Sequence, residues 1–295
     1  MYYNQNTILF LDGKWLKASE TKTSLYGQTL HYGNGVFEGI RAYETEHGPA
    51  IFKAKEHFER LLFSAEKMFI ELPYTVDQLV ELSYELLKKN QLTNAYIRPL
   101  VFMDETMRLN PSPTAHVLMV AWEWKQYFTG EQLIHVMTSP YQRPNPKAFH
   151  VEAKVTGHYS NSILASTHAK RQGFDEALLL DMNGHVAEAP GANFFYEKDN
   201  KLYTCPKGHI LPGITRATMF ELCEQLEIEL EEKFFTAEEV RGADSAFFVG
   251  TATEVAGIAT LDNVPFKLNW KDSLGYQLAK AYQREVLEID PVYIF

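Results

Sequence analysis

The stretch Phe149-His-Val-Glu-Ala-Lys-Val-Thr-Gly-His-Tyr-Ser-Asn-Ser-Ile163 decides how the rest of the chain is interpreted. It places one lysine, Lys154, in a strand-like run that then turns into a helix. A buried lysine can lose its proton and then form a Schiff base with an aldehyde or a ketone. Lysines in strands are mostly solvated. Lys154 alone therefore leaves both interpretations open, and the rest of the chain has to decide between them.

Length and composition bound the class of protein. At 295 residues the chain is long enough for two domains of about 150 residues each. Its hydrophobic fraction of 45% and charged fraction of 22% are those of a globular protein. No apolar run is long enough to span a bilayer, and the N-terminus lacks the basic start and cleavage site of a secretory signal. These features predict a cytoplasmic location.

Charge and motif content exclude several functions. The net charge of −10 argues against sequence-independent binding of nucleic acid, although a small anionic ligand is compatible with a local positive site. Cys205 and Cys223 form neither a disulfide framework nor a spaced metal cluster, so we interpret both as ordinary thiols and predict no metal. The sequence has no Gly-x-Ser-x-Gly, His-Glu-x-x-His, Walker or Gly-x-Gly-x-x-Gly motif. Hydrolase, metalloprotease, NTPase and dinucleotide-binding functions lack support.

The first part of the chain predicts a small α+β domain. Asp12-Gly13 predicts a tight hairpin turn between the first two strands. An apolar helical face runs from Ala54 to Phe69, and a second helix is expected over residues 76–89 with Thr75 as its N-cap. The expected strands are residues 7–10, 14–16, 36–43, 50–53, 95–103 and 116–124. The last two are rich in β-branched and aromatic residues, which favour strands.

The pattern breaks around Phe128-Thr-Gly-Glu131, which predicts a domain boundary. We predict a first domain at residues 1–128, a linker at 129–136 and a larger second domain at 137–295. The second domain is expected to alternate short strands with helices. The expected helices are residues 161–172, 215–226, 236–240 and 270–287, and the expected strands are 133–138, several within 176–203, 227–234 and several within 245–261.

Two segments have the composition of a main-chain anion site. Leu211-Pro-Gly-Ile-Thr-Arg216 opens a predicted helix, whose first N–H groups and dipole favour an anion. Gly250-Thr-Ala-Thr253 leaves a predicted strand with small residues that let a ligand approach the backbone. Taken alone, each segment is better explained as an ordinary helix cap or turn, so neither defines a site by itself.

Two charged residues have both a structural and a chemical interpretation. Arg60 lies outside the apolar stripe of its helix, so it could reach an anion or form a surface pair with Glu56, four residues earlier. Glu188 lies among small and apolar residues, and a buried carboxylate there requires a cationic partner. A protonated pyridine nitrogen would be such a partner. An exposed strand glutamate is the alternative.

Five segments, in this order, resemble branched-chain amino-acid aminotransferases: Leu30-His-Tyr-Gly-Asn-Gly-Val-Phe-Glu-Gly-Ile-Arg41, Ala95-Tyr-Ile-Arg-Pro-Leu100, the Lys154 segment, Leu211-Pro-Gly-Ile-Thr-Arg216 and Gly250-Thr-Ala-Thr-Glu254. The resemblance covers nearly the whole chain. It implies the α+β (mixed α/β), two-domain architecture of the fold type IV enzymes, which use pyridoxal 5′-phosphate. That architecture has a small α+β domain and a larger cofactor-binding domain with a β-barrel-like core.

The resemblance also implies roles for the cofactor-binding residues. Lys154 would form the Schiff base with the cofactor and later move a proton. Arg60 would bind the cofactor phosphate, Glu188 would bind the ring nitrogen, and Tyr159 would bind the ring oxygen. The remaining phosphate contacts would come from Ile214, Thr215 and Thr251.

The implied substrates set a physical problem, because one pocket must accept an apolar side chain in one half-reaction and the side-chain carboxylate of glutamate in the other. Arg98 and the hydroxyl of Tyr32 would meet that carboxylate. The α-carboxylate would be held by Tyr96 and by the amides of Thr251 and Ala252. The apolar wall would be made by Tyr32, Phe37, Trp124 and Tyr127.

The implied activity is transfer of the amino group of leucine, isoleucine or valine to 2-oxoglutarate by a homodimer or higher homo-oligomer. The alternatives on the same fold are a D-amino-acid or amine transaminase and an aminodeoxychorismate lyase, and a non-catalytic anion-binding protein is the alternative from another class. Three departures from the family pattern leave the substrate range open. They are Thr156-Gly-His158, Ala189-Pro-Gly-Ala192 and Glu105-Thr-Met-Arg108.

Overall fold

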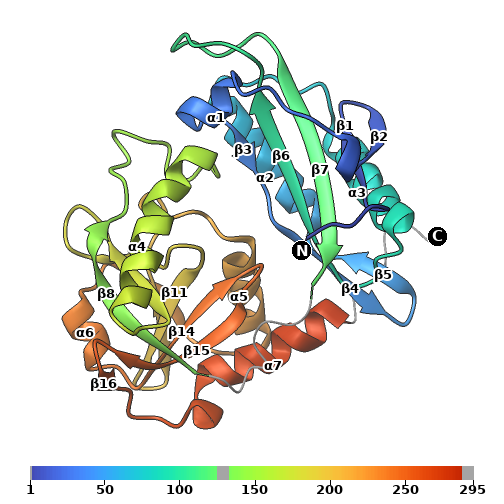
Figure 1. The fold of residues 1–295 in the computed structure, drawn as a ribbon. Helices are drawn as coiled ribbons and strands as arrows, with labels where there is room; N and C mark the ends of the chain where they lie inside the picture. Colours follow the sequence, from blue (N-terminus) through green and yellow to red (C-terminus); the bar gives the residue numbers. More distant parts are fainter. Residues whose placement is uncertain (1, 125–132, 288–295) are drawn as a thin grey trace. The chain divides into compact units, whose positions relative to one another are not determined.

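A computed structural model describes residues 2–124 and 133–287 of the chain. Its contacts divide into two compact units, which are described separately (Figure 1). The first unit contains residues 2–124, 153–157 and 286–287, and the second contains residues 133–152 and 158–285. The domain limits predicted above stay a prediction, because residues 125–132 lie outside the described part of the chain.

The first unit is built on a seven-stranded sheet of order β2-β1-β7-β6-β4-β5, with β3 also paired to β6. The hairpin at Asp12-Gly13 is confirmed, since β1 and β2 pair antiparallel on either side of it. The strands are β1 (Ile8–Leu11), β2 (Lys14–Lys17), β3 (Val36–Phe37), β4 (Ile40–Thr45), β5 (Gly48–Ile51), β6 (Ala95–Met103) and β7 (Ala115–Glu123).

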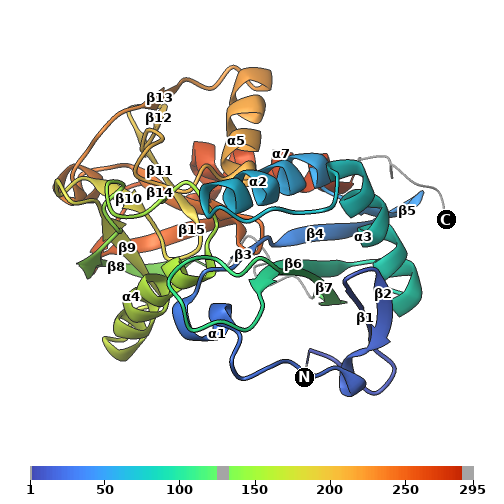
Figure 2. The same ribbon diagram turned by 90° about the horizontal axis from the view of Figure 1, so that it is seen from above.

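Two helices cover one face of this sheet, α2 (Ala54–Lys67) and α3 (Val76–Asn90), as Figure 2 shows. Both helices were predicted from the sequence, α2 from its apolar face and α3 with Thr75 as its N-cap. Phe58 and Leu61 of α2 and Leu86 of α3 are fully buried in the core between helices and sheet. Thr75 forms the predicted N-cap of α3 and completes a capping box with Gln78, which satisfies two otherwise unpaired N–H groups. The first unit also contains η1 (Ala18–Glu20) and the short helix α1 (Gln28–Tyr32).

The strand expected at residues 36–43 is interrupted at Glu38-Gly39. Both parts, β3 and β4, pair with β6, so side chains alternate between the faces of the sheet along the whole segment. Glu38 therefore lies on the face covered by α2, and Phe37 lies on the opposite face. Gly39 is required because a Cβ atom there would overlap the hydroxyl of Tyr96 at 1.8 Å.

The core of the second unit is a closed six-stranded barrel of order β10-β9-β8-β15-β14-β11, closed by the pairing of β11 with β10. This confirms the expected barrel-like core. The barrel strands are β8 (Ile134–Gln142), β9 (Glu176–Leu180), β10 (Val186–Glu188), β11 (Asn193–Lys198), β14 (Ser245–Gly250) and β15 (Glu254–Leu261). Outside the closed ring, β12 (Lys201–Thr204), β13 (Leu230–Glu232) and β16 (Val264–Pro265) extend the sheet.

Helices of the second unit flank the barrel. In Figure 1 α4 lies along β8, and its buried Ala165 and Ala169 pack against Ala177 and Leu179 of β9. The helices are η2 (Thr156–His158, mostly in the first unit), α4 (Tyr159–Arg171), α5 (Ile214–Gln225), α6 (Ala237–Arg241), η3 (Trp270–Asp272) and α7 (Leu274–Leu287). Within the described residues no helix is both long and apolar enough to cross a membrane.

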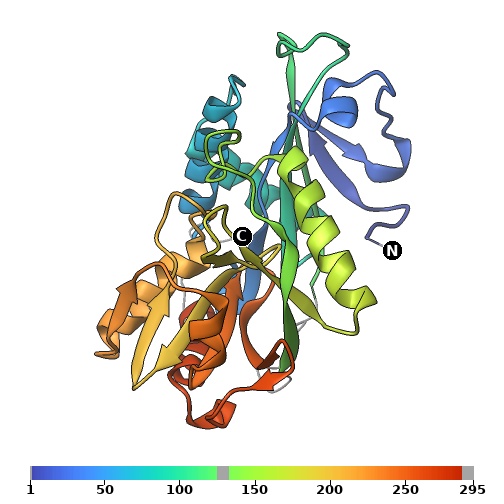
Figure 3. The ribbon, with the colours of Figure 1, turned by 90° about the vertical axis from the view of Figure 1, so that its left-hand side faces the viewer.

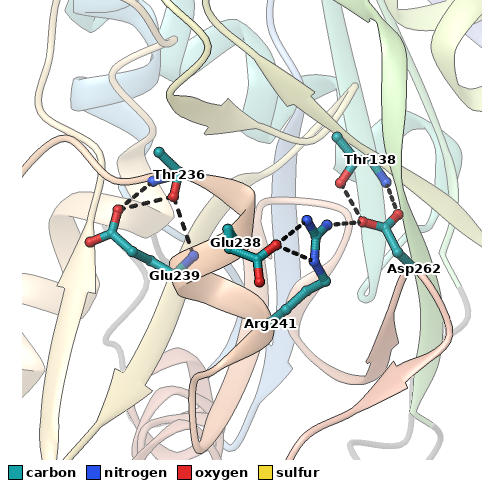
Figure 4. A network of polar contacts seen from close by, with 6 residues as sticks. All are labelled: Thr138, Thr236, Glu238, Glu239, Arg241 and Asp262. Atoms are coloured by element: carbon teal, nitrogen blue, oxygen red, sulfur yellow. Dashed lines mark hydrogen bonds and ion pairs between the residues drawn. The ribbon is translucent and has the colours of Figure 1, made fainter.

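A polar network joins α6 to the parallel pair β8 and β15 (Figure 4). Arg241 donates to Asp262 at 2.7 Å and to Glu238 at 2.6 Å. Asp262 in turn accepts from the main chain and the hydroxyl of Thr138, at 2.6 and 2.7 Å. Figure 4 also shows the capping box of Thr236 with Glu239 at the start of α6. The network therefore fixes the helix against the barrel by charge-assisted hydrogen bonds.

Two strand predictions differ from the structure: the strand at Lys154 is absent, and the strand at residues 227–234 is shorter than predicted. Lys154 does not lie in a strand, because residues 149–155 find no partner strand beyond a single bridge between Val155 and Val36. The strand expected at residues 227–234 shrinks to β13, since its first residues cap α5: the Ile228 amide donates to the Cys223 carbonyl at 2.8 Å.

Candidate active site

The main chain of Lys154 is held on both sides by residues of the first unit. Its amide donates to the hydroxyl oxygen of Ser64 at 2.9 Å, and its carbonyl accepts from the amide of Phe37 at 3.1 Å. Two residues on, Thr156 donates to the Gly33 carbonyl at 2.7 Å, and its hydroxyl accepts from the Gly35 amide at 3.1 Å. Thr156, a departure from the family pattern, thus anchors the lysine segment.

Arg60 forms a two-point ion pair with the fully buried Glu38. Its Nε and Nη2 atoms donate to the two carboxylate oxygens at 2.6 and 2.9 Å. His57, one turn before Arg60 on α2, contributes a third bond, with Nδ1 at 2.8 Å from the same carboxylate. The carboxylate facing Arg60 in this unit is therefore Glu38, a residue that sequence reasoning did not single out.

The protonation states of this cluster follow from burial and charge. Burial by itself would raise the pKa of Glu38, but Arg60 and His57 together hold that pKa well below its ordinary value. Burial lowers the pKa of His57, and the charges of Arg60 and Lys154 lower it further against the opposing effect of Glu38. Glu38 is therefore ionised and His57 neutral at neutral pH. A carboxylate can only accept, so the proton of His57 is on Nδ1.

The aromatic residues expected to line the substrate pocket do come together in the first unit. The Nζ atom of Lys154 lies 5.1 Å from the ring centre of Phe37, and the guanidinium of Arg98 lies 4.7 Å from the same ring. Arg98 also donates to the hydroxyl of Tyr96 at 3.3 Å, and the ring of Tyr96 packs on Trp124 with centres 4.8 Å apart. Amine, guanidinium and apolar rings therefore share one face of the sheet.

Two of the predicted pocket residues are not placed with this group. Tyr32 is half exposed, and its hydroxyl donates to the Met107 carbonyl at 3.3 Å. No hydrogen bond in the described part of the chain joins Tyr32 to Arg98. Tyr127 lies outside the described residues.

In the second unit Glu188 is buried and already has a cationic partner. Arg143, which is similarly buried, places its Nε atom 2.9 Å from the Glu188 carboxylate. The same carboxylate accepts from the Leu211 amide and from the side chain of Asn193, both at 3.1 Å. The expectation that a buried carboxylate needs a cation is met within the chain. A ring nitrogen would then be an additional partner.

The helix expected at residues 215–226 is α5, and its start has the geometry of an anion site. Gly213 is the N-cap, and no described side chain caps the first turn, so the amides there are available to an external acceptor. Gly213 is also required sterically, since a Cβ atom would lie 2.0 Å from the side-chain oxygen of Asn193. The side-chain amide of Asn193 donates to the Leu211 carbonyl at 3.0 Å and also to the Glu188 carboxylate. It therefore links Glu188 to the segment that leads into α5, whose first residues are Ile214 and Thr215.

Thr251 and Ala252 lie in the turn between β14 and β15. Gly250, just before them, packs against the turn that follows Glu188: a Cβ atom there would lie 3.2 Å from the Gly191 carbonyl. The two turns are therefore neighbours at one end of the barrel. Tyr159 lies apart from them in the sequence, as the first residue of α4 directly after η2.

The two cysteines are free and buried, which agrees with their interpretation as ordinary thiols. Both are buried, and burial raises the pKa of Cys205 and that of Cys223 to about 12. Neither is a thiolate at neutral pH, so neither is a nucleophile. Across the residues that the structure covers, no cluster of His, Cys, Asp or Glu has the arrangement of a metal site.

Sequence reasoning missed the residues that orient the predicted ones: Glu38, His57, Ser64, Arg143 and Asn193. His57, Arg60 and Ser64 are three and then four residues apart, so their shared helix face was readable from the sequence. Glu38 and Arg143 had no comparable signal. Their partners lie 22 and 45 positions away, and only the tertiary structure brings them together.

Comparison with known proteins places this site in a family. The family Amino-transferase class IV matches residues 35–261. A branched-chain-amino-acid aminotransferase of Pseudomonas aeruginosa is 39% identical over 284 residues, which cover 95% of this chain and 92% of that protein. The corresponding enzyme of Salmonella typhimurium is 37% identical over 263 residues, which cover 87% and 85%.

Solved structures agree over nearly the whole chain. The branched-chain aminotransferase of Thermoproteus uzoniensis with norvaline has 34% identity and a TM-score of 0.91, covering 95% of each chain. The branched-chain amino acid aminotransferase of Thermobaculum terrenum in its PLP-form has 28% identity and a TM-score of 0.91, covering 97% of this chain and 96% of that one. Fold and site thus define an amino-transferase of class IV. Within that class, the chain belongs to the branched-chain amino-acid aminotransferase family.

Proposed function

We propose that this enzyme transfers the amino group of leucine, isoleucine or valine to 2-oxoglutarate, using pyridoxal 5′-phosphate and Lys154 as the reactive amine. One observation supports the role of Lys154 above the others. Its Nζ atom lies over Phe37, and its segment is fixed to α2, the helix that carries Arg60 and its ion pair with the buried Glu38. A reactive amine and an anion-binding cation are thus held by one rigid element.

The residues present fit a phosphate-bearing cofactor. The uncapped first turn of α5 offers N–H groups and a helix dipole to a phosphate, and the missing Cβ of Gly213 leaves room beside Asn193. We propose that Arg60, Ile214, Thr215 and Thr251 hold the phosphate, that Glu188 faces the ring nitrogen, and that Tyr159 faces the ring oxygen. When bound, the cofactor supplies an electron sink for the carbanion formed at the substrate Cα.

The remaining catalytic work belongs to the chain. Lys154 would accept the proton of the substrate Cα as a neutral amine and return it at the other side of the reaction. Glu188, held by Arg143, Asn193 and Leu211, presents its carboxylate in one fixed orientation and needs no reorganisation during the reaction.

The arrangement around Arg98 suggests how one pocket handles two kinds of substrate. The guanidinium stacks on the ring of Phe37, so an apolar wall carries a cation at its edge. A branched side chain would contact the rings of Phe37 and Trp124, while a side-chain carboxylate would reach Arg98 and the hydroxyl of Tyr32. Tyr96 and the amides of Thr251 and Ala252 would hold the α-carboxylate, and Tyr127 would complete the wall.

Stereochemistry separates this proposal from its rivals on the same fold. Purified enzyme loaded with pyridoxal phosphate is incubated with L-leucine or with D-alanine, and the absorption band of the bound cofactor is followed. We expect only L-leucine to remove the band and 2-oxoglutarate to restore it. Conversion by D-alanine would favour a D-amino-acid transaminase. Failure of the protein to bind the cofactor at all would favour a non-catalytic anion-binding protein.

The homo-oligomer predicted from the sequence has a suitable surface in the first unit. The connection between β6 and β7, residues 104–114, extends past both strands (Figure 3), and Gln28 of α1 donates to its Arg108 and Asn110 carbonyls at 2.7 and 2.8 Å. Large apolar side chains are exposed on this connection and on α1 with the residues just before it: Leu25, Tyr26, Leu30, Met107 and Leu109. We propose that a second copy of the chain covers them, since a patch of this kind marks an interaction surface.

Sedimentation velocity tests this contact. The double variant Leu30→Asp, Leu109→Asp should shift the protein to monomers at micromolar concentration, because it places two charges in an apolar interface. Leu268→Asp, at another exposed leucine in the second unit, is the control and should sediment as the parent. Equal sedimentation of all three proteins would contradict the contact.

A cytoplasmic location remains part of the proposal and rests on the sequence alone.

A further inference from the structure

One face of α2 carries three polar side chains in the middle of a hydrophobic core. His57, Arg60 and Ser64 follow each other at intervals of three and four residues, which aligns them along the helix. His57 and Ser64 are fully buried, and the Arg60 side chain is 10% exposed. Buried polar groups destabilise a fold unless they are bonded, so such a row points to a specific use.

The first two side chains of this row, His57 and Arg60, both bind the carboxylate of Glu38. This carboxylate accepts four hydrogen bonds: two from Arg60, one from His57 and one, at 3.2 Å, from the main-chain amide of Gly39. Because the bonds to Arg60 use its Nε and Nη2 edge, the guanidinium plane is fixed and the Nη1 group is directed away from Glu38. Neutral His57 adds a hydrogen bond without adding a charge, so it steadies the carboxylate and leaves the Arg60–Glu38 pair neutral overall.

The third side chain of the row, Ser64, binds the main chain of Lys154. Its hydroxyl oxygen accepts the Lys154 amide at 2.9 Å, across 90 positions of sequence. The carbonyl of the same lysine is held by Phe37, the residue that precedes Glu38 in the chain. The backbone of Lys154 is therefore bonded to α2 on one side and to the strand that leads into Glu38 on the other.

We propose that Glu38, His57 and Ser64 are positioning residues of this enzyme. Glu38 and His57 orient Arg60, Ser64 orients Lys154, and the rigid helix between them sets the distance from the phosphate-binding cation to the reactive amine. None of the three touches the reacting atoms. The inference rests on the proposed roles of Arg60 and Lys154, and it adds that their geometry is set by one helix face.

The test of Glu38 uses the apoenzyme and two aldehydes that differ only in the phosphate. In Glu38→Gln we expect pyridoxal phosphate to bind at least about tenfold more weakly, the equivalent of one charge-assisted hydrogen bond, while pyridoxal binding stays within about twofold. Equal weakening of both ligands, or of neither, would overturn the orienting role. If this variant does not fold, His57→Phe should show the same selective loss. His57→Asn, which keeps an N–H near the position of Nδ1, should restore it.

The test of Ser64 has a matched control in Ser83, a fully buried serine of α3 whose hydroxyl bonds only within its own helix and to Met119. In Ser64→Ala we expect the Lys154 amide to exchange its hydrogen at least about tenfold faster, because it loses its acceptor. Labelling of Lys154 by pyridoxal and borohydride should slow in parallel. Ser83→Ala should change neither, and equal behaviour of the two variants would overturn the proposal.

Labelling of the parent enzyme distinguishes a failure of the positioning role from a failure of the proposed function. If the parent protein is labelled by pyridoxal phosphate and borohydride at Lys154, the proposed function stands whatever the variants do, and unchanged variants would then reject only the positioning role. If the parent is labelled at another residue or not at all, the proposed function fails first.

Discussion

Replacing Lys154 with alanine should reduce the rate of amino transfer from L-leucine to 2-oxoglutarate by about 10⁴-fold or more. In the proposed mechanism the variant loses both the amine that binds the cofactor and the group that moves the proton, and removing one member of such a unit removes most of the catalysis. The measurement is the rate of a single half-reaction at saturating L-leucine. The absorption band of the bound cofactor should vanish as well.

The control for this prediction is Lys147→Ala, at an exposed lysine in the second unit whose side chain forms no ion pair with the part of the chain that the structure describes. It should retain the parent rate. Lys154→Ala should keep its folded structure, because the main-chain hydrogen bonds of this residue to Ser64 and Phe37 do not involve the side chain that is removed. Unchanged denaturation midpoints with lost activity would confirm a chemical role. A variant that still turns over L-leucine at a tenth of the parent rate would refute it.

Glu38→Ala should lower the free energy of unfolding by about 3–5 kcal/mol, the usual cost of removing one partner from a buried ion pair. The loss leaves the guanidinium of Arg60 and the Nδ1–H of His57 without their carboxylate in the core. Urea denaturation measures the change. Glu44→Ala, at an exposed position near the end of β4, should stay within about 0.5 kcal/mol of the parent. A loss below about 1 kcal/mol in Glu38→Ala would contradict the structure.

The same cluster predicts how stability depends on pH. The pKa of Glu38 is lowered in the folded chain, so its ionised form stabilises the fold above its ordinary value and this contribution is lost as the pH falls toward the folded pKa. The pKa of His57 is also lowered, so the unfolded chain takes up a proton near pH 6.5 that the folded chain refuses. Both effects have the same sign, and stability should fall on acidification.

Urea titrations between about pH 8 and pH 5 can isolate the contribution of His57. In His57→Asn, which does not titrate, the fall in stability between about pH 6.5 and pH 5 should be shallower than in the parent. Parallel curves for the two proteins would show that His57 does not titrate differently in the folded and unfolded chains. The prediction concerns the slope, so a uniform loss of stability in the variant leaves it intact.

Motif and spacing predicted the parts of this protein that are local. The Asp12-Gly13 hairpin, the N-cap at Thr75 and the glycine start of α5 all depend on residues within a few positions of each other. The order of the five family-like segments led to the aminotransferase family and its barrel. The strand predicted for the Lys154 segment was wrong, because the β-like composition there had no partner strand to pair with.

The sequence by itself indicated the family, the reaction and the lysine that we propose as the reactive amine, since each is carried by a short segment of the chain. The tertiary structure alone decided which groups hold those residues in place: Glu38 against Arg60, Ser64 against Lys154, and Arg143 against Glu188. These pairs are 22, 90 and 45 positions apart. Side chains so distant leave no periodicity in the sequence, and only the packing of helix on sheet and the closure of the barrel bring them within bonding distance.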